Sequence, residues 1–169
     1  MSTVKSDGSA FDVRGYRDAL GCFGTGVCLI TTRDEAGRAR AITANSFSSV
    51  SLHPPIILWC IDVHSDRYDL FAGADHFGVS FLREHHGDVS TEFARNVDAE
   101  LSGAELKVGQ HGIPLYADAL GYLECETGFR QKAGDHVVIF GNVIGFDAQA
   151  GNGLGFFKGD YTPLIEKKD

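Results

Sequence analysis

Short runs of apolar and β-branched residues, separated by turns that contain glycine or aspartate, dominate the pattern along this chain. Residues 27–32 and 38–43 are two such runs around the turn sequence Asp-Glu-Ala-Gly, which predicts a β-hairpin. Residues 119–129 and 136–146 are longer runs of the same kind. The segment 130–135 between them ends in Gly-Asp, so we predict a second, long antiparallel hairpin.

Two further strands are predicted at residues 56–62 and 77–82, which are short and apolar. The serine-rich residues 44–52 precede the first of them, and we interpret this segment as a polar loop that two prolines close. Near the C-terminus, residues 151–155 are rich in glycine and predict a flexible turn. A last edge strand is expected over residues 156–165.

Three short helices complete the expected elements. Residues 11–23 place apolar side chains at helical spacing, which predicts an amphipathic helix. We expect a second helix over residues 66–72 with Ser65 as its N-cap, because a serine hydroxyl accepts a hydrogen bond from a free amide at a helix start. A third helix is expected to end at residue 96.

The start of the third helix and the segment after it are less regular. Asp88 or Ser90 is the expected N-cap of that helix, since both residue types cap well. Residues 97–114 are polar and poorly periodic, so we expect a loop there. No internal repeat is present.

Strands and short helices without regular alternation favour a mainly β fold, a small closed antiparallel barrel with helical decoration, over a doubly wound sheet. The length of 169 residues fits one domain. We expect residues 11–169 to form that domain and the polar residues 1–10 to be a flexible tail.

The charge balance and the apolar runs exclude two classes of partner. Fifteen Lys and Arg against twenty-three Asp and Glu give a net charge of −8, so we expect no broad nucleic-acid surface. The longest apolar run, residues 56–61, is far shorter than the roughly 20 residues that span a bilayer, so we expect no membrane segment. Because the first ten residues lack an apolar signal core, we expect a cytoplasmic protein.

The four cysteines stand far apart without a Cys-x-x-Cys pair, and most lie in apolar runs, so we interpret them as reduced core residues. His85 and His86 are adjacent and next to acidic residues. We interpret them as a solvated turn, and we predict no metal site. The glycines at 21, 24 and 26 lack the order of a dinucleotide-binding loop.

Residues 43–55, Thr-Ala-Asn-Ser-Phe-Ser-Ser-Val-Ser-Leu-His-Pro-Pro, carry the clearest chemical signal. They combine neutral hydroxyls, one amide and small residues, which suit the carbonyl and nitrogen edge of a planar heteroaromatic ligand. A plain serine-rich loop is the alternative. Further along the chain, Asp135 and His136 follow a turn and open a strand, where an imidazole would project from a rigid scaffold.

The order of motifs resembles the short-chain flavin reductases, the reductase components of two-component flavin-dependent monooxygenases. The resemblance runs from about residue 11 to residue 164. It rests on the segment above and on further short motifs: G-T-G-V, F-G-V-S-F-L, E-F-A-R, G-I-P-L, L-E-C, and G-D-H followed by V-V-I-F-G-N-V. It implies a flavin-binding split β-barrel, antiparallel and Greek-key-like, that forms a homodimer with the flavin near the subunit interface.

The resemblance also implies a set of site residues. His136 of G-D-H would position the nicotinamide of NAD(P)H. The residues implied to bind FMN or FAD are Thr43, Ala44, Asn45, Ser46, Ser49, Val50, Ser51, Cys60, Ile61, Asp62, Ser65, Phe81, Phe93, Ala94 and Arg95, with Tyr161 flanking the nicotinamide pocket. Ser65 resembles a contact to the flavin phosphate.

One departure from the family pattern concerns that phosphate. Many members carry a basic residue followed by Phe shortly after Phe-Ala, whereas Glu100-Leu101 is the nearest counterpart here. Arg95, Arg67 and Arg83 are the cations available instead, and the choice between FMN and FAD stays open.

The resemblance implies an NAD(P)H:flavin oxidoreductase that supplies reduced flavin to a separate monooxygenase. Two alternatives remain open because a fold does not determine a function. One is a non-catalytic flavin-binding sensor or carrier of the same fold. The other is a flavin-dependent reductase that acts on its own organic substrate.

Overall fold

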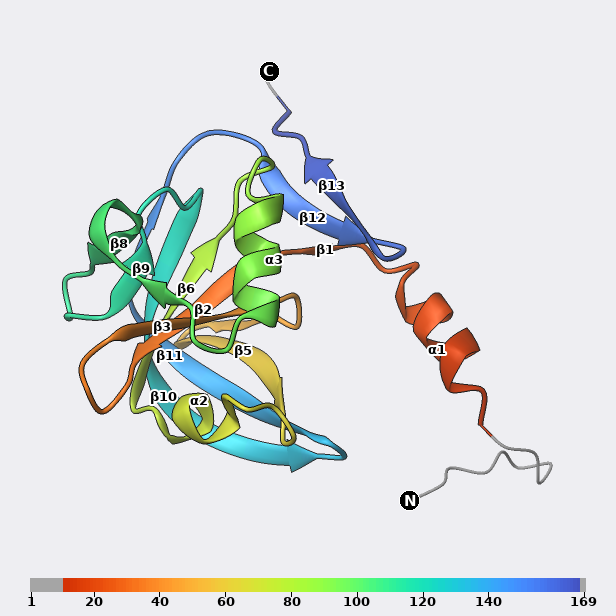
Figure 1. Ribbon diagram of the computed structural model, residues 1–169, viewed down its shortest axis with the longest axis horizontal. Helices are drawn as coiled ribbons and strands as arrows, with labels where there is room; N and C mark the ends of the chain where they lie inside the picture. The colour runs from red at the N-terminus through yellow and green to blue at the C-terminus, as the bar shows by residue number, and fades with distance from the viewer. Residues whose placement is uncertain (1–10, 168–169) are drawn as a thin grey trace.

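The computed structural model describes residues 11–167, so the tail predicted at residues 1–10 lies outside the described part of the chain. An antiparallel sheet of eight strands forms the body of the molecule (Figure 1). In spatial order its strands are β4 (Ser48–Leu52), β5 (Pro55–Asp62), β11 (His136–Ala148), β10 (Gly121–Ala133), β6 (His76–Phe81), β2 (Cys28–Arg33), β3 (Ala39–Ala44) and β7 (Glu100–Leu101).

Smaller elements surround this curled sheet. A second sheet contains β1 (Thr25–Gly26), β12 (Gly153–Phe157) and β13 (Asp160–Leu164), and a third pairs β8 (Leu106–Val108) with β9 (Pro114–Tyr116). The helices are α1 (Val13–Leu20), α2 (Tyr68–Gly73), α3 (Gly87–Arg95) and the short 3₁₀ helix η1 (Gly103–Glu105). Within residues 11–167 the end strands β4 and β7 do not pair with each other. The barrel is therefore split, as the resemblance implied, and not closed, as the pattern alone suggested.

Both predicted hairpins are confirmed. Strands β2 and β3 pair antiparallel, with Cys28 opposite Ala44. Strands β10 and β11 pair along their whole length and are longer than predicted, because the turn is confined to Gly134 and Asp135. Gly134 has a φ of 65°, which glycine adopts without strain.

Two segments predicted as loop or turn are strands. Residues 48–52 form β4, which pairs with β5. An edge strand can remain polar because neither its outer edge nor its exposed face needs apolar cover. Residues 153–157 form β12, so the single strand expected over 156–165 is instead the hairpin β12–β13, with its turn at Lys158 and Gly159.

The helices lie where expected, with different ends. Asp12 caps α1 by accepting a hydrogen bond from the Gly15 amide at 2.9 Å. Helix α2 begins at Tyr68, so the prediction of Ser65 as its N-cap is wrong. Helix α3 begins at Gly87, which places Asp88 and Ser90 inside it and not at its cap.

The core has two parts on opposite faces of β2, since Cys28 and Ile30 belong to one part and Leu29 to the other. Trp59, Phe71 and Phe77 meet edge to face in the first part. Leu29 and Phe93 lie in the second. The expected loop over residues 97–114 contributes to this second part, because it contains β7, η1 and β8 and buries Leu101.

All four cysteines are free thiols. Burial raises the pKa of both Cys28 and Cys125 to about 12, so these two are inert core residues. Cys60 is half-buried. Cys22 is exposed at the end of α1, so its assignment to the core is wrong.

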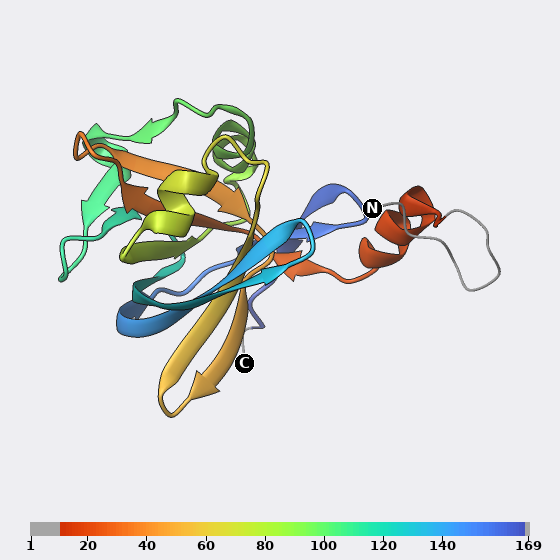
Figure 2. The ribbon, with the colours of Figure 1, turned by 90° about the horizontal axis from the view of Figure 1, so that it is seen from below.

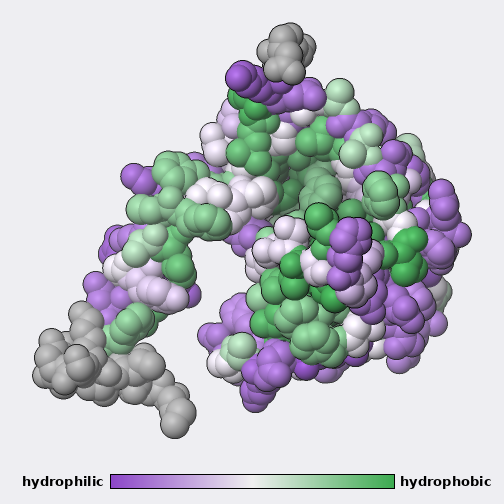
Figure 3. Space-filling model, turned by 180° about the vertical axis from the view of Figure 1, so that it is seen from behind, coloured by the Kyte–Doolittle hydropathy of each residue, from purple (hydrophilic) through white to green (hydrophobic). Residues whose placement is uncertain are grey.

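Helix α1 stands away from the body and is joined to it through β1 (Figures 1 and 2). The space-filling view shows apolar residues on this arm and around the hollow between it and the body (Figure 3). None of the described helices is both long and apolar enough to cross a membrane.

Gly78 in β6 lies at a point where the barrel is tightly packed. A Cβ atom there would overlap the Thr31 hydroxyl and would lie 2.7 Å from both Leu115 Cδ2 and the Pro114 carbonyl oxygen. We expect Gly78→Ala to lower the free energy of unfolding by about 2 to 3 kcal/mol in urea titrations. Gly73→Ala in α2 is the matched control, since nothing lies within 4 Å of the point that a Cβ atom would occupy there; a similar loss in that variant would contradict this account.

Candidate functional site

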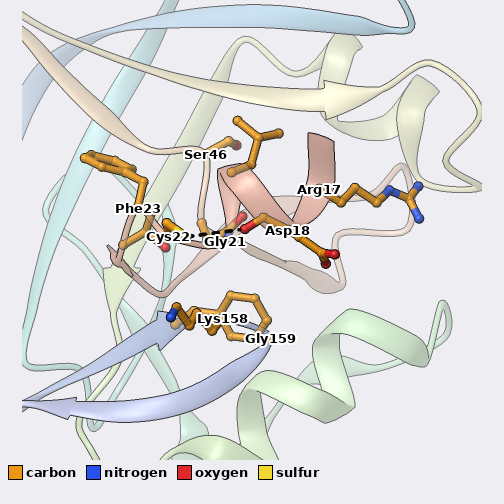
Figure 4. A pocket seen from close by; sticks show the side chains of 12 residues that line it. Arg17, Asp18, Gly21, Cys22, Phe23, Ser46, Lys158 and Gly159 are labelled. Atoms are coloured by element: carbon orange, nitrogen blue, oxygen red, sulfur yellow. Dashed lines mark hydrogen bonds between the residues drawn. The ribbon is translucent and has the colours of Figure 1, made fainter. Parts of the chain in front are cut away.

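Two adjoining cavities lie beside the end of β3 and the two residues that follow it. Cavity A, of about 1000 Å³, lies between the end of α1, the tip of the β12–β13 hairpin and the pair Asn45 and Ser46 (Figure 4). Cavity B, of about 240 Å³, is lined by Thr43, Ala44 and Asn45 together with residues of α3 and the hairpin. Asn45 and Phe156 line both cavities, so the two spaces form one site.

The polar segment is held in place by hydrogen bonds to its neighbours. The Thr43 hydroxyl donates to the Ser90 carbonyl oxygen of α3 at 2.6 Å. The Ser46 hydroxyl accepts from the Cys60 amide at 3.0 Å and donates to the Cys60 carbonyl oxygen at 3.1 Å. Both ends are thus anchored, while the side chain of Asn45 between them is exposed and free to meet a ligand.

Tyr161 closes cavity B from the hairpin. Its hydroxyl donates to the Ser90 hydroxyl at 2.8 Å, and its ring meets Phe156 edge to face at 5.7 Å. Phe156 and Ser90 were not predicted as site residues. Their positions depend on contacts between segments about 70 residues apart, which no local pattern encodes.

His136 opens β11 as predicted. It lies opposite Asp62 in register, and Val138 lies opposite Cys60. Alternate residues of a strand share a face, so Cys60, Asp62 and His136 lie on one face, opposite the buried Ile61. From strand spacing, His136 lies on the order of 10 Å from Ser46 across this face. His136 lines neither cavity A nor cavity B.

The His136 imidazole is tied to its neighbour in sequence. Its Nδ1 lies 2.8 Å from Asp135 Oδ1. This hydrogen bond holds the pKa of Asp135 below its ordinary value. A carboxylate beside Nδ1 leaves Nε2 as the atom that can face a ligand.

Ser65 and Arg67 lie outside cavities A and B. The Ser65 hydroxyl accepts from the Arg67 amide at 3.3 Å. The Arg67 guanidinium is buried and donates to the carbonyl oxygens of Ala41, Phe93 and Ala94 at 2.8 to 3.1 Å. It therefore joins α3 to β3, and these hydrogen bonds use most of its N–H donors.

The three candidate cations differ in availability. Arg83 is engaged by Asp118, Gln149 and nearby carbonyl oxygens. Arg95 is exposed at the end of α3 and makes no ion pair within the described residues, so it is the most accessible of the three. Glu100-Leu101, at the position of the missing basic motif, forms β7 and pairs with β3.

The remaining predicted residues fall into two groups. Ile61 and Phe93 are buried, and Phe81 packs edge to face on Phe47, so their side chains support the site from beneath. Ser49, Val50 and Ser51 lie on the edge strand β4, outside both cavities.

His85, His86 and Asp118 form a cluster whose potential ligand atoms lie within 4.8 Å of one another. The buried His86 accepts a hydrogen bond from the Arg83 amide at Nδ1, 3.1 Å away. Its Nε2 must then carry the proton and donate to Asp118 Oδ2 at 3.2 Å. A protonated nitrogen is not a metal ligand, so this geometry suits a structural hydrogen-bond network better than a metal site.

Comparison with known proteins identifies one family model, described as flavin reductase like domain, over residues 20–164. The chain is 39% identical to the stachydrine N-demethylase reductase subunit Stc3 of Rhizobium meliloti (strain 1021) over 98% of this chain and 71% of that protein. It is 37% identical to the reductase component of the flavin-dependent trigonelline monooxygenase of Acinetobacter baylyi over 93% of this chain and 51% of that protein.

A solved structure supports the same likeness. The NADH:FAD oxidoreductase SgcE6 of Streptomyces globisporus, in complex with NAD and FAD fragments, matches with a TM-score of 0.85 at 29% identity, and the match covers 100% of both chains. The chain spans about half the length of two of the curated relatives that it matches.

The His86 network predicts that the stability of the fold depends on pH. Burial, the largest cause, lowers the pKa of His86 below its ordinary value of 6.5. As the pH falls, His86 takes up a proton more readily in the unfolded chain than in the folded chain. The free energy of unfolding is therefore retained above about pH 6.5 and decreases as the pH falls below it. Unfolding in urea at about pH 7.5 and about pH 5.5 should show this loss.

His86→Gln should remove most of this pH dependence, because an amide can make both hydrogen bonds without titrating. His111→Gln, on an exposed turn, is the control and should keep it. If both variants lose stability on acidification as the wild type does, His86 is not the group responsible.

Proposed function

The chain belongs to the flavin reductase like domain family, and from this membership we propose that it is an NAD(P)H:flavin oxidoreductase. The observation that carries the proposal is the anchored neutral segment Thr43 to Ser46 between cavities A and B. It presents hydroxyl, amide and backbone groups but no charge. Such a lining suits a planar ring whose edge carries carbonyl oxygens and ring nitrogens.

The residues present fit a flavin. Cavity A is large enough for a tricyclic ring, and its lining is mainly apolar. The buried Thr25 hydroxyl in that lining has no hydrogen-bond partner in the described residues, so it is available to a ligand. Arg95 and Ser65 supply a cation and a hydroxyl for the phosphate.

The protein's task in this reaction is alignment. Bound flavin supplies the hydride-accepting ring and NAD(P)H supplies the hydride. Asn45 and the Thr43 hydroxyl would hold the ring edge, and Phe156 and Tyr161 would limit the space beside it. Fixing two reactants in one geometry lowers the entropic part of the barrier, so no side-chain nucleophile is required.

His136 is proposed to position the nicotinamide. It shares a face with Cys60 and Asp62, the strand wall implied for the flavin. Asp135 orients its ring through Nδ1, which leaves Nε2 to meet the carboxamide or a phosphate of NAD(P)H.

The proposed physiological role is the supply of reduced flavin to a separate monooxygenase. Relatives named as reductase subunits or components of such systems support this role. Free thiols at all four cysteines support a cytoplasmic location, where glutathione and thioredoxin keep thiols reduced.

A homodimer is part of the proposal. Helix α1 stands clear of the body, so the apolar side chains of Val13, Tyr16 and Leu20 are each more than half exposed. Exposed Leu52 and Phe146 lie on strands β4 and β11 of the main sheet, which β5 separates. Apolar surfaces of this kind are normally covered in an assembly, and a second copy supplies matching patches.

The first test is oxidation of NADH and NADPH by the purified protein with FMN or FAD added separately, followed by the absorbance of the reduced nicotinamide. We expect saturable turnover that requires added flavin. His136→Ala should lower it about tenfold or more, while the dissociation constant of the flavin stays nearly unchanged. His111→Ala, an exposed histidine that lines neither cavity A nor cavity B, is the control.

Absence of turnover despite flavin binding would favour the sensor or the substrate-specific reductase. Equal losses of flavin binding and turnover in His136→Ala would refute the nicotinamide assignment.

The dimer can be tested by sedimentation equilibrium. We expect the wild type to sediment as a dimer and the double variant Val13→Asp, Tyr16→Asp as a monomer, because two buried carboxylates would oppose the interface. These residues do not line cavity A. Arg14→Ser on the same helix should remain a dimer; a monomeric wild type would contradict the assignment.

A further inference from the structure

Two hydroxyl groups meet at the wall of cavity B, one from α3 and one from β13. The Tyr161 hydroxyl donates to the Ser90 hydroxyl at 2.8 Å, and both residues line the cavity. The function proposed above uses Tyr161 only to limit the space in cavity B, and it gives Ser90 no role.

The hydrogen bonds of Ser90 leave one proton unused. Ser90 is buried, with 0% of its surface exposed. Its amide donates to the His86 carbonyl oxygen at 2.9 Å, and its carbonyl oxygen accepts from the Thr43 hydroxyl at 2.6 Å. Its side-chain hydroxyl accepts from Tyr161 but donates to no group among residues 11–167. One hydroxyl proton therefore remains at the wall of cavity B without an acceptor.

The surroundings of the hydroxyl pair do not supply this acceptor. Thr91, whose hydroxyl lies 3.5 Å from that of Tyr161, donates its own proton to the Gly87 carbonyl oxygen at 2.9 Å. The Tyr161 ring meets Phe156 edge to face, which limits its movement away from Ser90. A buried donor without an acceptor costs free energy, and an acceptor atom on a ligand removes that cost.

The rest of the lining indicates which acceptor fits. Val27, Ala44 and Phe156 offer apolar surface. Among the described residues, none that lines cavity B is charged, so a charged oxygen would lose its hydration there without gaining a cation. The Asn45 amide can both donate and accept. The lining therefore suits the carbonyl oxygen of a neutral planar ring.

Both reactants of the proposed function carry such an oxygen: the flavin in its ring carbonyls, and the nicotinamide in its carboxamide. The position of cavity B favours the flavin. Asn45 and Phe156 line both cavity A and cavity B, so a ring in cavity A can extend one edge into cavity B. The mainly apolar cavity A suits the hydrocarbon end of the flavin ring, which leaves the carbonyl end for cavity B.

We propose that Ser90 is a flavin-binding residue whose hydroxyl donates to a ring carbonyl oxygen, and that Tyr161 orients this hydroxyl by donating to its oxygen. The proposal rests on the proposed function, because it takes the flavin ring to lie in cavities A and B. Through its own carbonyl oxygen, Ser90 also holds the Thr43 hydroxyl. One buried residue of α3 thus positions groups from β3 and from β13 around the same ring edge.

Titration calorimetry with FMN and with FAD, in the absence of nicotinamide cofactor, tests the proposal. We expect Ser90→Ala to raise the dissociation constant of the flavin about tenfold, through the loss of one hydrogen bond. Tyr161→Phe should raise it less, because Ser90 keeps its own proton. Thr127→Val is the control: it removes a hydroxyl that donates to the Ala74 carbonyl oxygen at 2.7 Å, outside both cavities, and should bind flavin as the wild type does.

Infrared difference spectra of the bound flavin separate a direct contact from a purely structural role. One ring carbonyl band should move to higher frequency in Ser90→Ala, because that carbonyl loses a hydrogen bond, and should stay in place in Thr127→Val. Weakened binding in Ser90→Ala with unshifted carbonyl bands would mean that Ser90 only holds α3 in position, and the proposal would be wrong.

The KM for NADH at saturating flavin separates the two sources of the carbonyl oxygen. We expect it to stay unchanged in Ser90→Ala. A raised KM for NADH with an unchanged flavin dissociation constant would assign the contact to the carboxamide and overturn the flavin assignment. If neither quantity changes, Ser90 does not meet a ligand and the proposal fails while the proposed function stands. Failure of the wild type to bind either flavin would instead refute the proposed function.

Discussion

The packing of α3 against β3 is the constraint on which the rest of the site depends. Two kinds of hydrogen bond hold it: the Thr43 hydroxyl to the Ser90 carbonyl oxygen near one end, and the Arg67 guanidinium to Ala41, Phe93 and Ala94 near the other. These ties fix Thr43 and Ser90, which both line cavity B. A buried guanidinium that joins three carbonyl oxygens is difficult to replace, since no other side chain offers as many fixed donors.

Neutral and charged groups line different parts of the site. The segment Thr43 to Ser46 presents only neutral groups to cavities A and B, whereas the charged side chains of Arg17, Asp18 and Lys158 also line cavity A. This division matches the two tasks of a flavin site. A ring that changes its electron count is held best by hydroxyls and amides, whose donors and acceptors serve either state, whereas phosphates need fixed positive charge.

Local pattern was sufficient for elements whose signals are local. The hairpins β2–β3 and β10–β11 combine apolar strands with turn residues, so their sequence alone predicts them. Strand β4 was missed because its serines face solvent at a sheet edge, where polarity carries no information about pairing. The polar segment at Thr43 could be identified from residue types, whereas Phe156 and Ser90 join the site only through tertiary contacts. The availability of Arg95 and the burial of Arg67 are likewise properties of the fold.

The hairpin β12–β13 links the site to the exposed arm. It carries Phe156 and Tyr161, which line cavity B, and at its tip the Lys158 amide donates to the Gly21 carbonyl oxygen at the end of α1, at 2.9 Å. Lys158 adopts a φ of 51°, the one positive value among the described residues other than glycine, and this turn geometry is what brings its amide to α1. A partner that fixes α1 therefore also fixes the strand that carries Tyr161. In the proposed dimer, assembly and the shape of cavity B are connected through this backbone hydrogen bond and through β1, which follows α1 and pairs with β12.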